Sequence, residues 1–220
     1  MSNQPPIGVP QGAIRFNTDS QKLEFFAQDR WYEMATDVPT LDGGARGLFT
    51  SGYNHTAYRD VVDMITIPTA GNATDFADMI SGIAPYGAAG GASRTRGMIA
   101  GGAIDGNGSL DVIQYITIAQ QADFVDFGDL TKGRRGFGAM TNQTRFVAAG
   151  GYSDPDSSRV NNIDFVTIAS LGDAVDFGDA SAARYQNGYG GMASASRGVF
   201  QGGASPSSNI IEYVTISSMG

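Results

Sequence analysis

Apolar residues in this chain gather in short segments in which apolar and polar side chains alternate. The clearest segment covers residues 112–118. A period of two is typical of a β-strand, because successive side chains point to opposite faces of a sheet. Glycine is abundant at 31 residues and charged residues make up only 16%, as in proteins built from short strands and tight turns. The sequence therefore predicts an all-β protein with almost no helix.

One strand pattern occurs four times, in residues 64–67, 115–118, 165–168 and 213–216. Its threonines are 51, 50 and 48 residues apart. A second pattern begins at intervals of 50, 49 and 52 residues, at Arg46, Arg96, Arg145 and Arg197. An Asp-Phe pair also recurs, at residues 75–76, 126–127 and 176–177. Patterns in phase indicate a structural repeat, and a period near 50 residues is typical of arrays in which each repeat supplies one small sheet of a β-propeller.

The repeats divide the chain into two expected parts. Residues 1–35 do not follow the repeat, whereas residues 36–220 form a repeat domain of four units, 36–70, 71–121, 122–170 and 171–220. In the second unit we expect strands at residues 73–76, 86–89, 97–100 and 112–118. Glycine pairs at 101–102, 150–151 and 202–203 predict close approach of neighbouring backbones and positive φ angles.

The repeated strand pattern also predicts the core and the closure of the array. We expect its apolar side chains to be buried between sheets, namely Ile67, Ile118, Ile168, Ile216, Tyr115, Phe165 and Tyr213. If the units form one propeller, Thr36 and Asp37 should lie in the sheet that contains residues 213–216, because closure removes the free edges. An open stack, or sheets shared between chains, is the alternative.

The N-terminal part combines an extended leader with an aromatic hairpin. Pro5, Pro6 and Pro10 keep the first residues extended, and strand segments 13–16 and 23–26 flank turn residues 17–21. The apolar side chains expected at an interface are Ile14, Phe16, Leu23, Phe25, Phe26 and Trp31. Because a hairpin cannot bury both faces by itself, we expect residues 1–35 to mediate self-association or docking on a larger assembly.

Charge and residue types argue against several functions. A net charge of −8 disfavours nucleic acid as a partner, and no apolar segment approaches bilayer length, so we expect no membrane insertion. The chain has no cysteine and one histidine, His55, which argues against Ser-His-Asp hydrolysis, His-rich metal centres and copper-radical oxidase chemistry. We expect neither an enzyme nor a cofactor.

The repeated charged residues have a structural interpretation. Carboxylate pairs occur at Asp126 with Asp129 and at Asp176 with Asp179. A catalytic pair is needed once and need not recur with a repeat. We interpret these acids and the four repeated arginines as partners of one another that hold neighbouring sheets together.

Two loops depart from the repeat and carry candidate ligands. Alternating oxygen donors, as at the start of a calcium loop, occur in residues 103–111 and 152–158, at Asp105, Asn107, Ser109, Asp154 and Asp156. Both loops lack the terminal glutamate, so solvated turns are favoured over a metal site. Loop tyrosines Tyr53, Tyr152 and Tyr189 could instead stack on sugars.

These motifs resemble kelch-like repeat proteins and, more narrowly, glycine-rich structural proteins of tailed-bacteriophage virions. The resemblance rests on the Tyr-Val-Thr-Ile pattern, the Asp-Phe-Gly-Asp segments at 126–129 and 176–179, the Arg-Gly and Gly-Gly pairs, and the hairpin at residues 12–26 followed by Trp31. The repeats have no tryptophan, unlike the common kelch signature. The resemblance implies a capsid-fibre, decoration or tail-associated protein located in the virion.

The function expected from this resemblance has two parts. The N-terminus would dock on other virion proteins and form a homo-oligomer, with a trimer favoured because fibre-like phage proteins commonly are trimers. The repeat domain would project, and a host-surface glycan is a candidate ligand. The alternative is a free-standing carbohydrate-binding or adhesion module with a propeller-type fold.

Overall fold

The computed structural model describes residues 8–18, 22–34, 46–50, 52, 56–81, 83, 85–185, 191–203 and 207–218. The chain forms two compact units, Met1–Thr40 and Leu41–Gly220. The protein is all-β, as predicted, and its regular elements in these residues are strands in small antiparallel sheets. No described helix is long and apolar enough to cross a membrane.

The N-terminal unit is a three-stranded antiparallel sheet instead of the predicted two-stranded hairpin. Its strands are β1 (Ile14–Asn17), β2 (Lys22–Ala27) and β3 (Arg30–Glu33), in the order β1-β2-β3. Gln28 and Asp29 join β2 to β3 with φ angles of 49° and 57°, as expected for the central residues of a tight two-residue hairpin turn. The third strand gives the aromatic pair Trp31 and Tyr32 partners on β2, Phe26 and Phe25.

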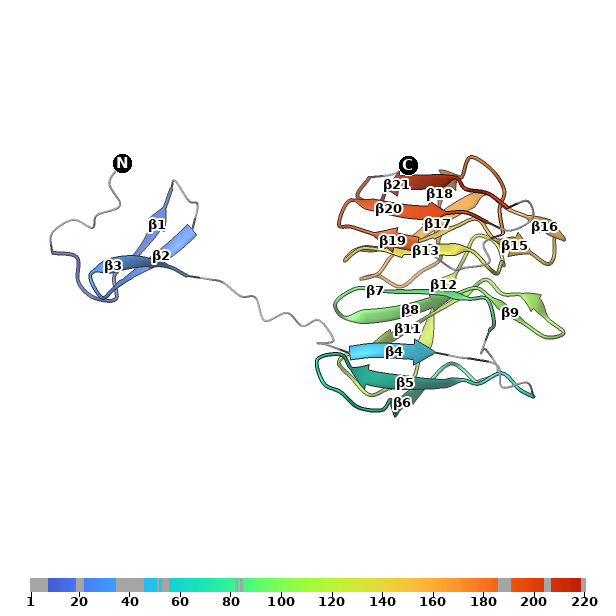
Figure 1. Ribbon diagram of the computed structural model, residues 1–220, viewed down its shortest axis with the longest axis horizontal. Coiled ribbons are helices and arrows are strands. Elements are labelled where there is room, and N and C mark those ends of the chain that lie inside the picture. The colour runs from blue at the N-terminus through green and yellow to red at the C-terminus, as the bar shows by residue number, and fades with distance from the viewer. Residues whose placement is uncertain are drawn as a thin grey trace. The chain divides into compact units, whose positions relative to one another are not determined.

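In the second compact unit, which we call the repeat unit, the described residues form four sheets of three or four strands, which Figure 1 shows one above another. The first sheet consists of β4 (Arg46–Thr50), β5 (Val61–Thr66) and β6 (Thr74–Asp78). The second has the order β12-β11-β8-β7, from β7 (Ala89–Ala92), β8 (Arg96–Ala100), β11 (Val112–Thr117) and β12 (Val125–Asp129). The third repeats this order with β13 (Gly138–Thr141), β14 (Arg145–Ala149), β17 (Asn162–Thr167) and β18 (Val175–Asp179). The fourth comprises β19 (Gly191–Ala193), β20 (Arg197–Gln201) and β21 (Ile211–Thr215).

In the first three sheets, the last strand comes from the sequence repeat that follows. β6 pairs with β5, β12 with β11 and β18 with β17, each with a register shift in the middle of the pair. The predicted units therefore begin one strand too early, because the Asp-Phe strand completes the preceding sheet. In the second sequence repeat (residues 71–121), the strand predicted at 86–89 begins only at Ala89, while Tyr86 forms an isolated bridge with Ala103.

Two short hairpins extend from the second and third sheets. They are β9 (Ala103–Ile104) with β10 (Gly108–Ser109), and β15 (Tyr152–Ser153) with β16 (Ser158–Arg159). Each follows a glycine pair with positive φ, and Gly102 N and Gly151 N donate to Arg134 O and Arg184 O at 2.9 and 2.8 Å. A Cβ on Gly101 would lie 2.5 Å from Arg134 O. The glycine pairs thus permit the close backbone approach that the sequence predicts.

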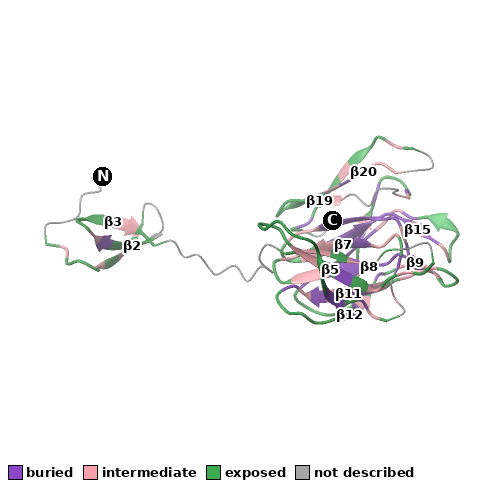
Figure 2. Ribbon diagram, turned by 60° about the horizontal axis from the view of Figure 1, so that its bottom comes forward, coloured by how far each residue is buried: buried purple, intermediate pink, exposed green. Residues whose placement is uncertain are grey.

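The core lies between the sheets, in layers that separate consecutive sheets. One face of each internal sheet, the leading face, packs on the next sheet along the chain, and the opposite, receiving face packs on the sheet before. The leading face of the third sheet contributes Met140, Val147 and Phe165, which pack against Phe200 and Ile216 of the fourth sheet. Figure 2 shows buried residues along β7, β8 and β11, inside the stack.

A repeated hydrogen bond joins each sheet to the next. The guanidinium of Arg46 donates to Ile118 O at 2.6 Å, that of Arg96 to Ile168 O at 2.5 Å and that of Arg145 to Ile216 O at 2.6 Å. The arginines therefore do hold neighbouring sheets together, but the prediction that the repeated carboxylates are their partners is wrong. An isoleucine carbonyl of the next sheet is the acceptor, because the arginine lies at the strand end that faces it.

The predicted core residues divide according to their position in the stack. Ile118, Ile168, Ile216 and Phe165 are buried and Tyr115 is half-buried, whereas Ile67 is 64% exposed and Tyr213 is 62% exposed. For these two the prediction of burial is wrong. Ile67 lies on the receiving face of the first sheet and Tyr213 on the leading face of the fourth, so neither has a neighbouring sheet among the described residues.

The predicted closure through Thr36 and Asp37 lies outside the described residues. Within these, no strand pairs with the outer edge of β21, and the sheets form an open stack without a closed propeller. The first and fourth sheets lie at its two ends (Figure 1).

Ile118 and Ile67 form a matched pair for testing these layers. We expect Ile118→Asp to lower the free energy of unfolding by at least about 3 kcal/mol, because a carboxylate there would lose its hydration without a partner. Ile67→Asp, at the equivalent exposed position, should cost less than about 1 kcal/mol. Chemical denaturation of dilute protein measures both, and equal effects would contradict the assigned layers.

Candidate functional site

On one face of the N-terminal sheet, the side chains of Arg15, Asn17 and Glu24 hydrogen-bond to one another, whereas the buried indole N–H of Trp31 has no partner among the described residues. The Arg15 guanidinium lies 2.8 Å from the Glu24 carboxylate and 4.2 Å from the centre of the Trp31 ring, while the Asn17 amide donates to Glu24 at 2.8 Å. The hydrogen bond from Asn17, and then that from Arg15, hold the pKa of Glu24 below its ordinary value. Phe26 is buried on this face against Trp31.

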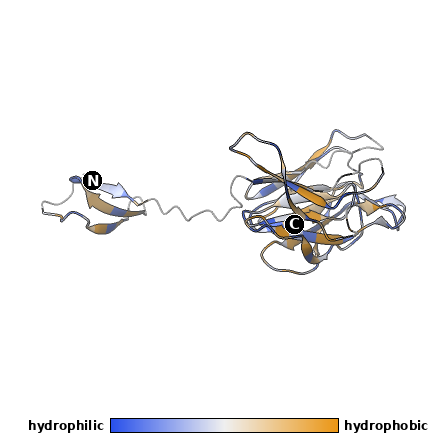
Figure 3. Cartoon of the chain, turned by 90° about the horizontal axis from the view of Figure 1, so that it is seen from below, coloured by the Kyte–Doolittle hydropathy of each residue, from blue (hydrophilic) through white to orange (hydrophobic). Residues whose placement is uncertain are grey.

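The opposite face is apolar and open to solvent. Ile14, Phe16, Leu23 and Phe25, which we call the hairpin apolar face, pair across β1 and β2 and are 37–64% exposed. Figure 3 shows orange, hydrophobic strand segments in this unit. Of the six predicted interface residues, these four share the exposed face, whereas Phe26 and Trp31 lie on the other. Such a concentration of exposed apolar side chains on one small sheet usually marks an association site.

A second candidate site runs across the repeats as a row of planar side chains. Tyr86, Arg135 and Tyr185 stand 49 and 50 residues apart, at the same position of three repeats. The Arg135 guanidinium lies 5.8, 5.1 and 5.6 Å from the ring centres of Tyr86, Tyr152 and Tyr185. Tyr58 stacks on Tyr86 at 5.6 Å with an interplanar angle of 16°. We call these five residues the tyrosine–arginine row.

Asp154 fixes the position of the arginine in this row. Its carboxylate accepts two hydrogen bonds from Arg135, at 2.9 and 3.0 Å, and one from the Ser109 hydroxyl at 2.5 Å. The bonds from Arg135 lower the pKa of Asp154, and burial opposes this effect. The same bonds raise the pKa of Arg135. This cluster ties the β9–β10 hairpin to the β15–β16 hairpin, because Ser109 belongs to the first and Asp154 to the turn of the second.

The calcium candidates have other partners in this arrangement. Ser109 and Asp154 do lie together, but a cation there would have to displace Arg135 from both carboxylate oxygens of Asp154. Asp156 pairs with Lys132 at 2.7 Å, and Asp105 and Asn107 are exposed in the turn of the β9–β10 hairpin. Among the described residues, no group of three or more carboxylate or histidine side chains could hold a metal ion.

The tyrosines predicted to face a ligand are only partly described. Tyr152 is half-buried and meets Tyr185 edge to face at 6.1 Å. Tyr53, Tyr189 and His55 lie outside the described residues. Sequence reasoning missed Tyr86, Arg135 and Tyr185 as site residues. The repeat alignment contained the signal, since these residues precede the repeated arginines Arg96, Arg145 and Arg197 by 10, 10 and 12 residues.

Other ionic groups connect the layers of the stack. Arg134 and Asp164 form a fully buried pair at 2.8 Å, and Arg184 pairs with Glu212 at the equivalent position of the next repeat. Burial lowers the pKa of Arg134, although Asp164 opposes this effect. Asp164 also accepts from Thr131 N, and Glu212 from Ser181 N. These carboxylates therefore anchor the segment that leads from one sheet to the next, which is a structural role.

The repeated aspartates form acidic groups at the outer strands. Burial first, and then Asp111, Asp173 and Asp126, raise the pKa of Asp129. Asp173 accepts a hydrogen bond from Asp129 N at 3.1 Å, and Asp123 accepts one from Asp78 N at 3.0 Å. Because the contact recurs with the repeat, we assign it to the stacking of sheets and not to catalysis.

Described residues of the first and second sheets and their connections line two pockets. One of about 350 Å³ is lined in part by Thr50, Pro85 and Tyr86, at the end of the tyrosine–arginine row. The other, of about 270 Å³, is lined in part by Leu48 and Met98. They lie beside the edge of β4 that has no partner strand among the described residues.

Comparison with known proteins gives no family assignment for this architecture. No protein-family model matches the chain, and no curated protein is similar enough to count as a relative.

The bond between Arg135 and Asp154 makes a pH-dependent prediction. We expect Asp154→Asn to lower the free energy of unfolding by about 1–3 kcal/mol at pH 7, since it removes a two-pronged charged hydrogen bond. The folded-state pKa of Asp154 is lowered, so its contribution is present above the unfolded pKa of about 3.9 and is lost as pH falls through the folded value. The difference from the wild type should therefore shrink below about pH 4 in denaturant titrations.

Asp105→Asn is the control, because Asp105 is exposed in the neighbouring turn. It should change stability by less than about 0.5 kcal/mol at either pH. A wild-type advantage over Asp154→Asn that persists unchanged in acid would count against the ionic bond.

Proposed function

We propose that this chain is a structural protein of a phage particle, a capsid-fibre, decoration or tail-associated component. The hairpin apolar face carries this proposal, because it lies on a compact unit separate from the repeat sheets. A separate small unit with an uncovered apolar face suits attachment to a partner, while a stack of sheets suits a projecting body. The resemblance of the repeats to phage virion proteins supplies the location.

The N-terminal unit would supply both docking and oligomerisation. Four exposed apolar side chains on a three-stranded sheet leave it without a core of its own on that side, and small sheets need such packing for stability. Copies of the same face could cover one another in a trimer, the state favoured by the fibre-like resemblance, or the face could lie on another virion protein.

The repeat sheets would form the projecting, propeller-type part. Polar groups in their interior serve packing, since Arg134 with Asp164 and Arg184 with Glu212 anchor connecting segments. We therefore propose a structural role for this part and no enzymatic one.

Phe16→Asp tests the attachment role against Thr18→Asp. Both place a carboxylate near the end of β1, but Phe16 lies on the hairpin apolar face and Thr18 in the exposed turn beyond the strand. Light scattering should show less of the hairpin-dependent oligomer for Phe16→Asp, because burying a carboxylate in an apolar contact is costly. The dissociation constant of the oligomer should rise at least about tenfold. Particles assembled with Phe16→Asp should contain less of the protein. Equal mass and equal incorporation for both variants would contradict the proposal.

Adhesion to a host-surface glycan is the second candidate function, and the tyrosine–arginine row favours it. Partly exposed aromatic rings next to a fixed arginine can stack on sugar rings and donate to their hydroxyls. Tyr86 is 38% exposed and lies beside the larger pocket.

Tyr86→Ala tests this second function in a glycan-array experiment. We expect it to weaken glycan binding at least about tenfold, whereas Leu171→Ala, an exposed apolar side chain in the turn after β17, should bind like the wild type. If glycans bind in the Phe16→Asp variant, which is impaired in assembly, the free-standing adhesion module gains support over the virion component. No binding by the wild type would remove this function.

A further inference from the structure

The two ends of the stack expose the two halves of the interface that joins its sheets. On the leading face of the third sheet, Met140, Val147 and Phe165 lie side by side across three strands, and the fourth sheet buries them. Met192, Val199 and Tyr213 occupy the same register positions in the fourth sheet. Met192 is 68% exposed there, and Ile211, beside Tyr213, is 66% exposed. Over its three strands, the leading face of the fourth sheet thus repeats the surface that is buried on β13, β14 and β17, although the described residues contain no counterpart of β18 and Phe177.

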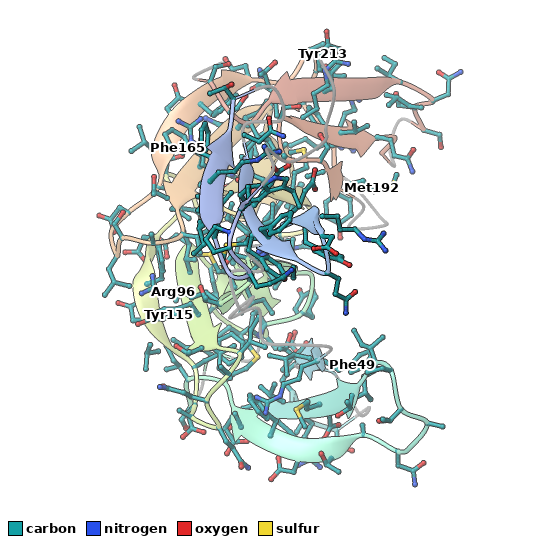
Figure 4. The ribbon with its side chains drawn as sticks, turned by 90° about the vertical axis from the view of Figure 1, so that its left-hand side faces the viewer. Phe49, Arg96, Tyr115, Phe165, Met192 and Tyr213 are labelled. Carbon is teal, nitrogen blue, oxygen red and sulfur yellow. The ribbon has the colours of Figure 1, made fainter. Side chains whose placement is uncertain are left out.

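The receiving face of the first sheet is the other half. In the fourth sheet this face carries Phe200 and Ile216, both buried against the third sheet. Phe49 and Ile67 hold the equivalent positions in the first sheet and are 58% and 64% exposed. Ile65 lies between them on the same face, because it pairs with Gly47, two residues before Phe49 on β4. Figure 4 shows Phe49 and Tyr213 toward opposite ends of the curved array.

The unused hydrogen-bonding groups match in the same way. Arg46, Arg96 and Arg145 each donate to an isoleucine carbonyl of the next sheet. Arg197 lies over the Tyr213 ring at 5.0 Å, as Arg145 lies over Phe165 at 4.9 Å. In the described part of the chain, however, the Arg197 guanidinium has no carbonyl acceptor, and the Ile67 carbonyl receives no arginine. Within the described ranges, the fourth sheet therefore has a free donor, the Arg197 guanidinium, and the first sheet has a matching acceptor, the Ile67 carbonyl.

We propose that a second copy of this chain covers these faces, with the fourth sheet of one copy packed on the first sheet of the next. The contact continues the interface that joins the sheets within the chain, with Arg197 of one copy donating to the Ile67 carbonyl of the other. It joins two different surfaces, so it generates either a closed ring of sheets or an open filament. It uses no residue of the hairpin apolar face and does not depend on the proposed function.

The full-length chain tests this contact through one substitution at each end. Phe49→Asp blocks the first sheet and Tyr213→Asp the fourth, and both side chains are exposed, so the substitutions leave the internal layers intact. Sedimentation velocity over a concentration series should show end-to-end association of the wild type, weakened at least about tenfold by either variant and by Arg197→Ala. Leu171→Asp, with an equally exposed side chain away from both faces, should associate like the wild type.

Mixtures of labelled variants distinguish this contact from association through the hairpin. Phe49→Asp leaves the binding face of the fourth sheet unaltered, and Tyr213→Asp leaves that of the first sheet unaltered. A donor-labelled sample of one variant mixed with an acceptor-labelled sample of the other should therefore show resonance energy transfer. Hairpin contacts are the same in all samples, so a mixture of differently labelled Phe49→Asp chains measures their contribution.

The proposal is overturned if the complementary mixture transfers no more energy than this control, or if the wild type shows no association that the end variants weaken. It is also overturned if Phe16→Asp and Tyr213→Asp weaken association while Phe49→Asp does not, because the hairpin would then cover the fourth sheet.

Discussion

Each sheet of the repeat unit depends on a neighbour to cover its apolar faces. Sheets of three or four short strands have little core of their own, and the buried side chains here lie in the layers between consecutive sheets. Covering one large apolar side chain contributes about 1.5–3 kcal/mol, so a sheet with both faces covered is held far more firmly than one at an end. This dependence explains why equivalent isoleucines are buried inside the stack and exposed at its first sheet.

The repeated arginines add direction to this stacking. For Arg46, Arg96 and Arg145, an aromatic side chain of the same sheet lies under the guanidinium and a carbonyl of the following sheet accepts its hydrogen bond. A carbonyl acceptor needs no second charge to be removed from water, so the contact avoids much of the desolvation cost of a buried ion pair. The bond always runs from one sheet to the next along the chain, and therefore the two ends of the stack differ. The ends cannot be equivalent surfaces, which is why head-to-tail contact between copies suits this stack better than a two-fold symmetric contact.

The N-terminal unit meets the same constraint in another way. Arg15, Asn17 and Glu24 cover one face of its sheet with hydrogen-bonded polar groups around Trp31, while the other face stays apolar and exposed. The unit thus has one face covered by polar side chains and one exposed apolar face. The repeat stack has an exposed apolar face at each end, so the described residues present three apolar faces that no other described element covers.

The sequence by itself determined the all-β class, the period near 50 residues, the glycine pairs and the apolar hairpin, because alternation, spacing and turn residues are local properties. It could not determine which strands share a sheet. The Asp-Phe strand belongs in sequence to one repeat but hydrogen-bonds to a strand of the preceding repeat. Strand pairing depends on which sheet edge is free in space. The hydrogen-bond acceptors of the arginines could not be predicted from the sequence either, since Arg96 and Ile168 are 72 residues apart. Only the tertiary structure decided that the stack stays open among the described residues, and with it that Ile67 and Tyr213, whose sequence patterns match those of buried residues, face solvent.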